Sequence, residues 1–246
     1  MAVRELRLRY VGTGLGFVWG LLHPLAFVAV FWFVFSVGLK VRPHGDVPFL
    51  AYYLTGYLPW MLFTETLMAS SNAVVGNPYL VKKTVFPTEI LPVVHLIASL
   101  LNHLILLLLT LGVLVYYGTP LTPYLLQLPL AFLLVAMMAL GLSWIFAALN
   151  VLYRDIGQSL PIVINLFFWA TPVVWSIGNL PENMQRLIRL NPFVFMVESY
   201  RECLLYGRPL WDNSVAATAF VILAFSCFAF GYFTFNRLKP HFADVI

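Results

Sequence analysis

The stretch NPYLVKKTVFPTEILP, residues 77–92, is a cationic segment with three prolines that separates two long apolar runs, residues 49–69 and 92–117. A helix of about 20 predominantly apolar residues is long enough to cross the hydrocarbon core of a bilayer, which is roughly 30 Å thick. Each run therefore predicts a transmembrane helix. The segment that joins them, residues 70–91, is then expected to lie in water on one side of the membrane.

The whole chain has the composition of a membrane protein. Of its 246 residues, 61% are hydrophobic and 10% are charged, whereas soluble domains average about 45–50% apolar and about 25% charged residues. A backbone exposed to lipid must satisfy its own hydrogen bonds, and the chain has none of the alternating segments of a β-barrel, so we predict an all-α fold. A single domain, residues 1–246, is predicted to contain six transmembrane helices: residues 21–39, 49–69, 92–117, 124–149, 161–178 and 214–235.

Lysines and arginines in short loops indicate which side of a membrane protein faces the cytoplasm. The residues predicted to be cytoplasmic are Arg4, Arg7, Arg9, Lys82, Lys83, Arg154, Arg237 and Lys239. Against them stand Lys40 and Arg42 on the other side, together with four arginines in residues 179–213, a segment that also contains acidic residues. An even number of spans places both termini on one side, so we expect both in the cytoplasm. The net charge of +4 requires no nucleic-acid partner.

Polar residues inside the predicted spans allow two interpretations. His95, Ser99 and Asn102 fall on one helical face. Hydrogen bonds between helices explain such a stripe, and a proton or metal site is the alternative. Glu65 lies near the inner end of its span, where it is either functional or simply at the boundary with water. We predict no catalytic residue, no cofactor site and no metal site in this chain.

Residues 179–213 are too apolar for an ordinary loop and too interrupted for a span. Their pattern predicts two short helices, separated by a break at Asn191 and Pro192. In the second helix Arg201 lies one turn from Glu198, so the two side chains can form an ion pair. We expect a re-entrant helix pair at the external mouth, before the last span.

Residues 1–20 mix arginines with leucines and aromatic residues, which predicts an interfacial helix in the headgroup layer. This segment and three others resemble the membrane (permease) subunits of ABC exporters for lipid-linked polysaccharides, a family that includes O-antigen, capsule and teichoic-acid systems. The matching stretches are RLRYVGTGLGFVWGLLHPL (7–25), NPYLVKKTVFPTEILP (77–92), LNVLYRDIGQ (149–158) and LNPFVFMVESYRECLLYG (190–207). Their order along nearly the whole chain is more specific than any one of them.

The resemblance implies a transport subunit, not an enzyme, in the bacterial inner (cytoplasmic) membrane. It implies a homodimer that forms a channel for a lipid-linked polysaccharide of O-antigen type, with two copies of a separate ATPase subunit that bind ATP and Mg²⁺. The chain itself lacks the G-x-x-x-x-G-K-S/T loop that holds nucleotide phosphates. A permease for teichoic acid, capsule, a drug or a lipid is the alternative. A membrane enzyme acting on lipid-linked sugars is less favoured, because it needs paired acids or a metal site.

The resemblance also implies two groups of functional residues. Residues 70–91 would couple the membrane helices to the ATPase, with the lysines approaching an acidic surface and Phe86 serving as an apolar anchor; a solvated basic loop is the alternative. The coupling residues would be Asn77, Leu80, Lys82, Lys83, Phe86, Pro87, Glu89, Arg154 and Asp155. An external gate would be formed by Asn191, Pro192, Glu198 and Arg201.

Aromatic residues recur at helical spacing in the second and fifth predicted spans. They are Tyr53, Tyr57, Trp60, Phe168 and Trp175. Aromatic rings stack on the CH faces of sugar rings without requiring one pattern of hydroxyl groups. These residues are therefore candidates to line the channel, and lipid-facing or interfacial aromatic residues are the alternative.

Overall fold

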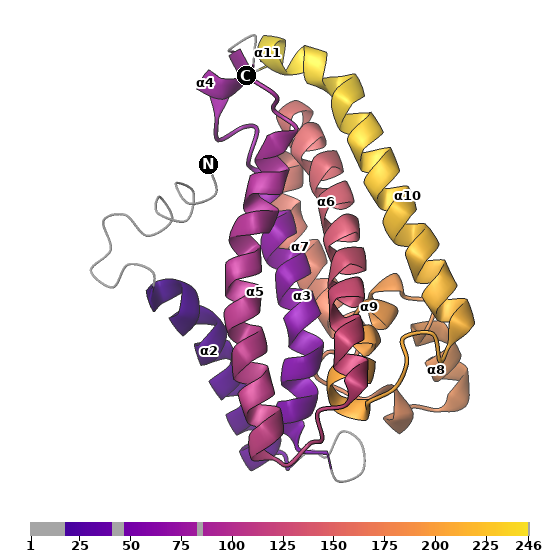
Figure 1. Ribbon diagram of the computed structural model, residues 1–246. Coiled ribbons are helices and arrows are strands. Elements are labelled where there is room, and N and C mark those ends of the chain that lie inside the picture. Colours follow the sequence, from indigo (N-terminus) through magenta and orange to yellow (C-terminus); the bar gives the residue numbers. More distant parts are fainter. Residues whose placement is uncertain (1–17, 41–46, 83–85, 246) are drawn as a thin grey trace.

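The computed structural model describes residues 18–40, 47–82 and 86–245; Lys83 and most of the predicted interfacial segment 1–20 lie outside these ranges. Every regular element in the described ranges is a helix (Figure 1), which confirms the all-α class. The longer α-helices are α2 (Val18–Trp32), α3 (Phe49–Ser71), α5 (Ile90–Tyr116), α6 (Leu128–Leu152), α7 (Asp155–Ala170) and α10 (Ser214–Leu238). The shorter ones are α4 (Pro78–Lys82), α8 (Glu182–Ile188), α9 (Pro192–Arg201) and α11 (Phe242–Val245). The 3-10 or π elements are η1 (Phe33–Gly38), η2 (Pro123–Gln127), η3 (Ile177–Asn179), η4 (Glu202–Tyr206) and η5 (Lys239–His241).

Figure 1 shows α3, α5 and α6 side by side at the centre of the bundle, and the contacts of α10 with α6 and of α2 with α3 place these two helices around the centre. The helices α4 and α11 lie together at one end of the bundle, which we call the α4 end. The short helix α8 lies at the opposite end, which we call the α8 end.

The central helix is α3, because nearly all of its surface is covered. Most of its 23 residues are buried, including Tyr52, Tyr53 and the internal Pro59. A helix that is covered all round belongs in a core. Among the 16 described residues of α7, by contrast, Leu160 alone is buried. The apolar surface of α7 is therefore largely uncovered in a single copy of the chain.

Three described helices are long and apolar enough to cross a membrane, by length and composition: Ile90–Tyr116, Pro123–Leu152 and Ser214–His241. A shorter apolar helix covers Pro24–Gly38. Helix α3 has sufficient length, but its tyrosines, its threonines and Glu65 lower its mean hydropathy. The full set of six spans stays a prediction.

The fifth helix differs from the predicted run 161–178. It begins earlier, at Asp155, because a negative charge in the first turn stabilises the helix N-terminus. It also ends earlier, at Ala170, because Thr171 has an extended backbone and the residue before a proline disfavours the helical conformation. The proline in question, Pro172, opens an irregular segment that is buried against the rest of the bundle.

Candidate functional site

The predicted coupling segment forms the short helix α4 and a following turn, both packed on the α4 end. The Asn77 side chain donates through Nδ2 to the carbonyl of Ala73 at 2.9 Å, and the Asn77 carbonyl accepts from the Leu80 amide at 3.0 Å. Leu80 and Phe86 pack against an apolar cluster that includes the buried Phe242 of α11. Phe86 thus contributes to packing within its own chain.

Tyr79, at 69% of its surface, and Lys82 are among the exposed side chains of α4. They lie one turn apart on the helix and so share a face. Sequence reasoning missed Tyr79, although its spacing from Lys82 was the signal that could have identified it.

Glu89 is another predicted coupling residue. It lies just before α5, and two other parts of the chain form hydrogen bonds with it. Its Oε2 accepts from Nζ of Lys239 at 2.6 Å, and its carbonyl accepts from Nε1 of Trp144 at 3.0 Å. Partial burial raises the pKa of Glu89, but the hydrogen bond and the charge of Lys239 outweigh this and leave the pKa below its ordinary value. Glu89 therefore ties the start of α5 to α6 and to the end of α10. The neighbouring Pro87 is half-buried.

Asn150, which the sequence analysis did not single out, joins three helices at the α4 end. Its Nδ2 donates to the carbonyl of Ser71 at 2.9 Å and to Oδ1 of Asn72 at 3.1 Å. Its Oδ1 accepts from the amide of Gly157 at 2.8 Å. The side chain thus holds the end of α3 and the start of α7 against α6.

A second coupling contact was predicted at Arg154 and Asp155, which lie where α6 leads into α7: Arg154 precedes α7, and Asp155 is its first residue. Both are exposed, and neither forms an ion pair with any residue in the described ranges. An ion pair between Arg154 and Asp155 would have explained these residues without a partner protein. No such pair is present in the described part of the chain.

We expect Asn150→Leu to lower the free energy of unfolding by about 2–3 kcal/mol, because it leaves the Ser71 carbonyl and the Gly157 amide buried without their partner. Thermal unfolding of the purified protein in detergent measures this effect. Asn179→Leu is the control, since Asn179 is exposed and its side chain forms no hydrogen bond within the described ranges. Equal melting temperatures for the two variants would contradict the role of Asn150.

The polar stripe on α5 faces α3. His95, Ser99 and Asn102 are buried, and Nδ2 of Asn102 donates to Oε1 of Glu65 at 2.7 Å. The preferred interpretation of the stripe, hydrogen bonding between helices, is confirmed for Asn102. Within the described ranges, no three His, Cys, Asp or Glu side chains gather closely enough to hold a metal ion.

Four of the predicted channel-lining aromatic residues, Tyr53, Tyr57, Trp60 and Phe168, belong to a packed cluster that links α2, α3, α7 and α9. Tyr53 is fully buried between the rings of Phe31 (5.1 Å between centroids) and Tyr57 (5.3 Å). Trp60 is also buried, with its ring 5.7 Å from that of Phe168. Tyr57 and Phe168 are partly exposed in a single copy of the chain. Their role in a channel stays a prediction.

The expected helical spacing of Phe168 and Trp175 is wrong, because α7 ends between them. Trp175 lies in the irregular segment after α7, where its Nε1 donates to the carbonyl of Trp169 at 3.1 Å. The Trp175 carbonyl accepts from the hydroxyl of Tyr52 at 3.0 Å. Trp175 therefore helps to hold this segment against α3.

Of the predicted gate residues, Arg201 on α9 is fully buried and bound on several sides. Its Nη1 donates to the carbonyl of Pro172 (2.7 Å) and to Oε1 of Glu198 (2.9 Å), and its Nη2 donates to the carbonyl of Val173 (2.8 Å). Its guanidinium lies 3.6 Å from the centroid of the Tyr52 ring. Arg201 therefore fastens α9 to α3 and to the segment after α7.

The two short helices expected in residues 179–213 are present as α8 and α9. Asn191 caps α9, since its Oδ1 accepts from the amide of Phe193 at 3.0 Å, and Pro192 occupies the first turn. The Asn191 Nδ2 also donates to Oγ1 of Thr171 at 3.0 Å. The break between α8 and α9 is thus a structured cap that is tied to the end of α7.

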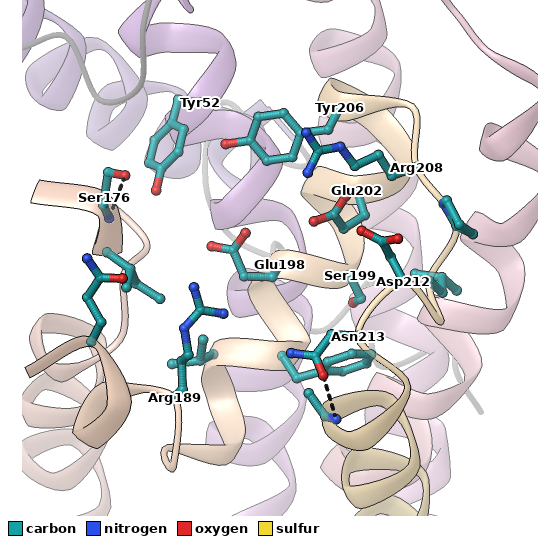
Figure 2. Close-up of a pocket in the computed structure, with 18 residues that line it drawn as sticks. Tyr52, Ser176, Arg189, Glu198, Ser199, Glu202, Tyr206, Arg208, Asp212 and Asn213 are labelled. Carbon is teal, nitrogen blue, oxygen red and sulfur yellow. Dashed lines mark hydrogen bonds between the residues drawn. The ribbon is translucent and has the colours of Figure 1, made fainter. Parts of the chain in front are cut away.

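A cavity of about 390 Å³ lies at the α8 end, beside the Glu198–Arg201 pair. Its wall is built by α3, η3, α8, α9, η4 and the loop that leads into α10 (Figure 2). Glu198, Glu202 and Arg189 point into it. Burial raises the pKa of Glu202 above its ordinary value; the charge of Arg208 opposes this shift, and the charges of Glu198 and Asp212 add to it. No sequence pattern indicated Tyr52 in this wall, because Tyr52 lies far away along the chain.

Comparison with known proteins gives a consistent assignment. The family model described as ABC-2 type transporter matches residues 1–205. The chain is 28% identical over 245 residues to the O-antigen export system permease protein RfbA of Klebsiella pneumoniae, which covers 99% of this chain and 92% of that protein. It is 30% identical over 227 residues to the permease of the same name from Myxococcus xanthus, with 89% and 85% covered. It is 24% identical over 206 residues to the polysialic acid transport protein KpsM of Escherichia coli, with 83% and 80% covered.

The match to the family model extends over most of the chain, from before α2 to η4. It therefore includes α4, α9 and the segment between α7 and α9, where the coupling and gate residues were predicted. By this match the chain belongs to the ABC-2 type transporter family, as a membrane permease and not an enzyme.

Proposed function

We propose that this chain is the membrane subunit of an ATP-driven exporter that moves a lipid-linked polysaccharide of O-antigen type from the cytoplasmic side of the bacterial inner membrane. The observation that carries the proposal is the similarity to O-antigen export permeases over 99% of the chain. The similarity to a polysialic acid transport protein supports a capsule polysaccharide as the second candidate.

ATP is hydrolysed by a separate subunit, which docks on the α4 end. This end carries Lys82, Arg154, Arg237 and Lys239, and a cationic cytoplasmic face agrees with the charge rule for membrane proteins. Both termini are then cytoplasmic, and the α8 end with its Glu198–Arg201 pair faces outward as the gate.

The working unit contains two copies of this chain and two ATPase subunits. The exposed face of α7 supports pairing with a second copy, since Ile162, Leu166 and Trp169 each expose more than half of their surface. The same helix exposes Asn165. Small or polar residues commonly mediate contacts between membrane helices, so this face suits a protein neighbour. Partly exposed Tyr57 and Phe168 would line the channel between the copies.

The test is reconstitution of the chain with its ATPase in liposomes. We expect ATP-dependent movement of an undecaprenyl-linked glycan across the bilayer, and ATP hydrolysis that rises when this substrate is present. A complex that hydrolyses ATP in response to a drug or a phospholipid, and not to any glycan, would overturn the proposal.

We expect Lys82→Glu to reduce glycan-stimulated ATP hydrolysis at least fivefold, because it reverses the charge that α4 presents to the ATPase. Charge reversal at an interface costs affinity when it creates like-charge contacts. Arg186→Glu is the matched control: it reverses an exposed cation on the short helix at the α8 end. If both variants retain full stimulation, α4 is not the docking site.

A further inference from the structure

The cavity at the α8 end has no part in the docking of an ATPase at the α4 end. Its lining comes from one chain alone, from α3 to the start of α10. Its volume of about 390 Å³ falls in the range of sites that bind small molecules, roughly 300–1,000 Å³.

The polar groups of the cavity are of both signs and are dispersed around it. Arg189 at the end of α8 and Arg208 after η4 lie on opposite sides of the cavity, and Glu202 and Asp212 lie near Arg208 (Figure 2). Arg189 and Asp212 have no side-chain ion pair or hydrogen bond with any described residue. Oε2 of Glu202 is buried and also lacks a hydrogen-bond partner in the described part of the chain. The side chains of Arg189 and Asp212 are therefore available to a ligand, and Glu202 lines the same cavity.

Apolar ring surface completes the lining. Tyr52, Tyr206 and Phe195 contribute to the wall. The ring of Phe195 is held in place by that of Phe220, 5.1 Å away between centroids, and the Tyr52 ring is held by the guanidinium of Arg201. Phe195 and Tyr206 are partly exposed and offer an apolar face beside the charged groups, whereas Tyr52 is 2% exposed and only borders the cavity.

We propose that this cavity is a sugar-binding site that holds one or two units of the glycan at the α8 end. Carboxylates there accept hydrogen bonds from sugar hydroxyl groups, arginines donate to sugar oxygens, and the rings cover the CH faces. A site for a phosphate-bearing lipid headgroup has cations that converge on one point. Arg189 and Arg208 lie apart, so their arrangement does not favour such a headgroup. The choice of a sugar as the ligand rests on the proposed function.

The test uses the complete complex with its ATPase in lipid nanodiscs. The probe is the mixture of soluble oligosaccharides released by mild acid from the cell-surface polysaccharide of the strain that encodes this chain. Binding is followed by saturation-transfer NMR and titration. We expect Glu202→Gln and Arg189→Gln each to weaken binding by about tenfold, the effect of one hydrogen bond to a charged group. Glu182→Gln and Arg186→Gln, on exposed residues of α8 outside the cavity, should bind as the unaltered protein does.

Each outcome decides between the proposals. Equal binding by the cavity variants and the controls, with unchanged melting temperatures, would overturn the cavity site, as would displacement of the sugar by phosphoethanolamine at equal concentration. Absence of oligosaccharide binding, while ATP-dependent glycan transport continues, would also overturn the site and leave the proposed function standing. Binding that depends on Glu202 and Arg189 in a complex that transports no glycan would overturn the proposed function and keep the site.

Discussion

Arg201→Leu is expected to lower the free energy of unfolding by about 3–5 kcal/mol, the usual consequence of removing one partner from a buried charged network. The guanidinium is fully buried, and it satisfies the carbonyls of Pro172 and Val173 as well as the carboxylate of Glu198. Leucine fills part of the volume but donates no hydrogen bond, so two buried carbonyls lose their partners.

The measurement is the thermal unfolding of purified variants in detergent, followed by tryptophan fluorescence. Arg201→Lys should also be destabilised, because a single ammonium group cannot reproduce the planar fork of donors or its stacking on Tyr52. Arg186→Leu is the matched control, since Arg186 is exposed on the neighbouring helix α8. A melting temperature of Arg201→Leu that matches that of the control would show that the network contributes nothing.

Gly56→Ala tests the same network from the opposite helix. A Cβ built on Gly56 would lie 2.5 Å from Nη2 of Arg201, so α3 can pass this close to the guanidinium only because residue 56 has no side chain. The two residues that were predicted as one gate pair therefore have different roles. Arg201 fixes α9 in place, whereas Glu198 is partly exposed and lines the cavity while its carboxylate accepts a hydrogen bond from Arg201.

The sequence predicted those parts of the fold that depend on composition and local spacing. Long apolar runs predicted α5, α6 and α10 because length and hydropathy alone specify such helices. The i,i+3 spacing predicted the Glu198–Arg201 pair, which the structure contains. The bounds of α7 differ from the apolar run 161–178, because hydropathy does not register the polar first turn that begins at Asp155 or the helix end before Pro172.

The remaining features depend on contacts between residues that are far apart along the chain. Tyr52 contacts Arg201 across 149 positions, and Lys239 reaches Glu89 across 150. In the sequence, no pattern distinguishes Asn150 from other polar residues at helix ends. Only the arrangement of α3, α6 and α7 shows that its hydrogen bonds join three helices. A single sequence carries no signal for such partners, since hydropathy and spacing describe one helix at a time.

Gly231→Ala is expected to destabilise the protein by about 3 kcal/mol or more, at the upper end of the effects of overpacking. Helices α6 and α10 make the most extensive contact between any two helices in the described chain, and they approach most closely where Gly231 faces Gly141. A Cβ on Gly231 would overlap the backbone carbonyl of Gly141, and a Cβ on Gly141 would overlap the backbone of Cys227. Because backbone atoms cannot rotate away as a side chain can, the two helices must separate.

The control for this prediction has the opposite sign. Gly112 on α5 is exposed, and a Cβ there meets nothing within 4 Å. Gly112→Ala should therefore raise stability by about 0.5–1 kcal/mol, the difference between glycine and alanine inside a helix. Thermal unfolding of both single variants gives the contrast directly, and two changes of the same sign would contradict the close packing of α6 on α10.

The double variant Gly141→Ala/Gly231→Ala separates close packing from a general loss of helix stability. If each added methyl group acts by forcing α6 and α10 apart, the first substitution already produces most of the separation that the second requires. The loss in the double variant should then be smaller than the sum of the two single losses, as is usual for residues in contact. Additive losses would mean that the two glycines act independently, and the short distance between these helices would then not be what holds α10 against the bundle.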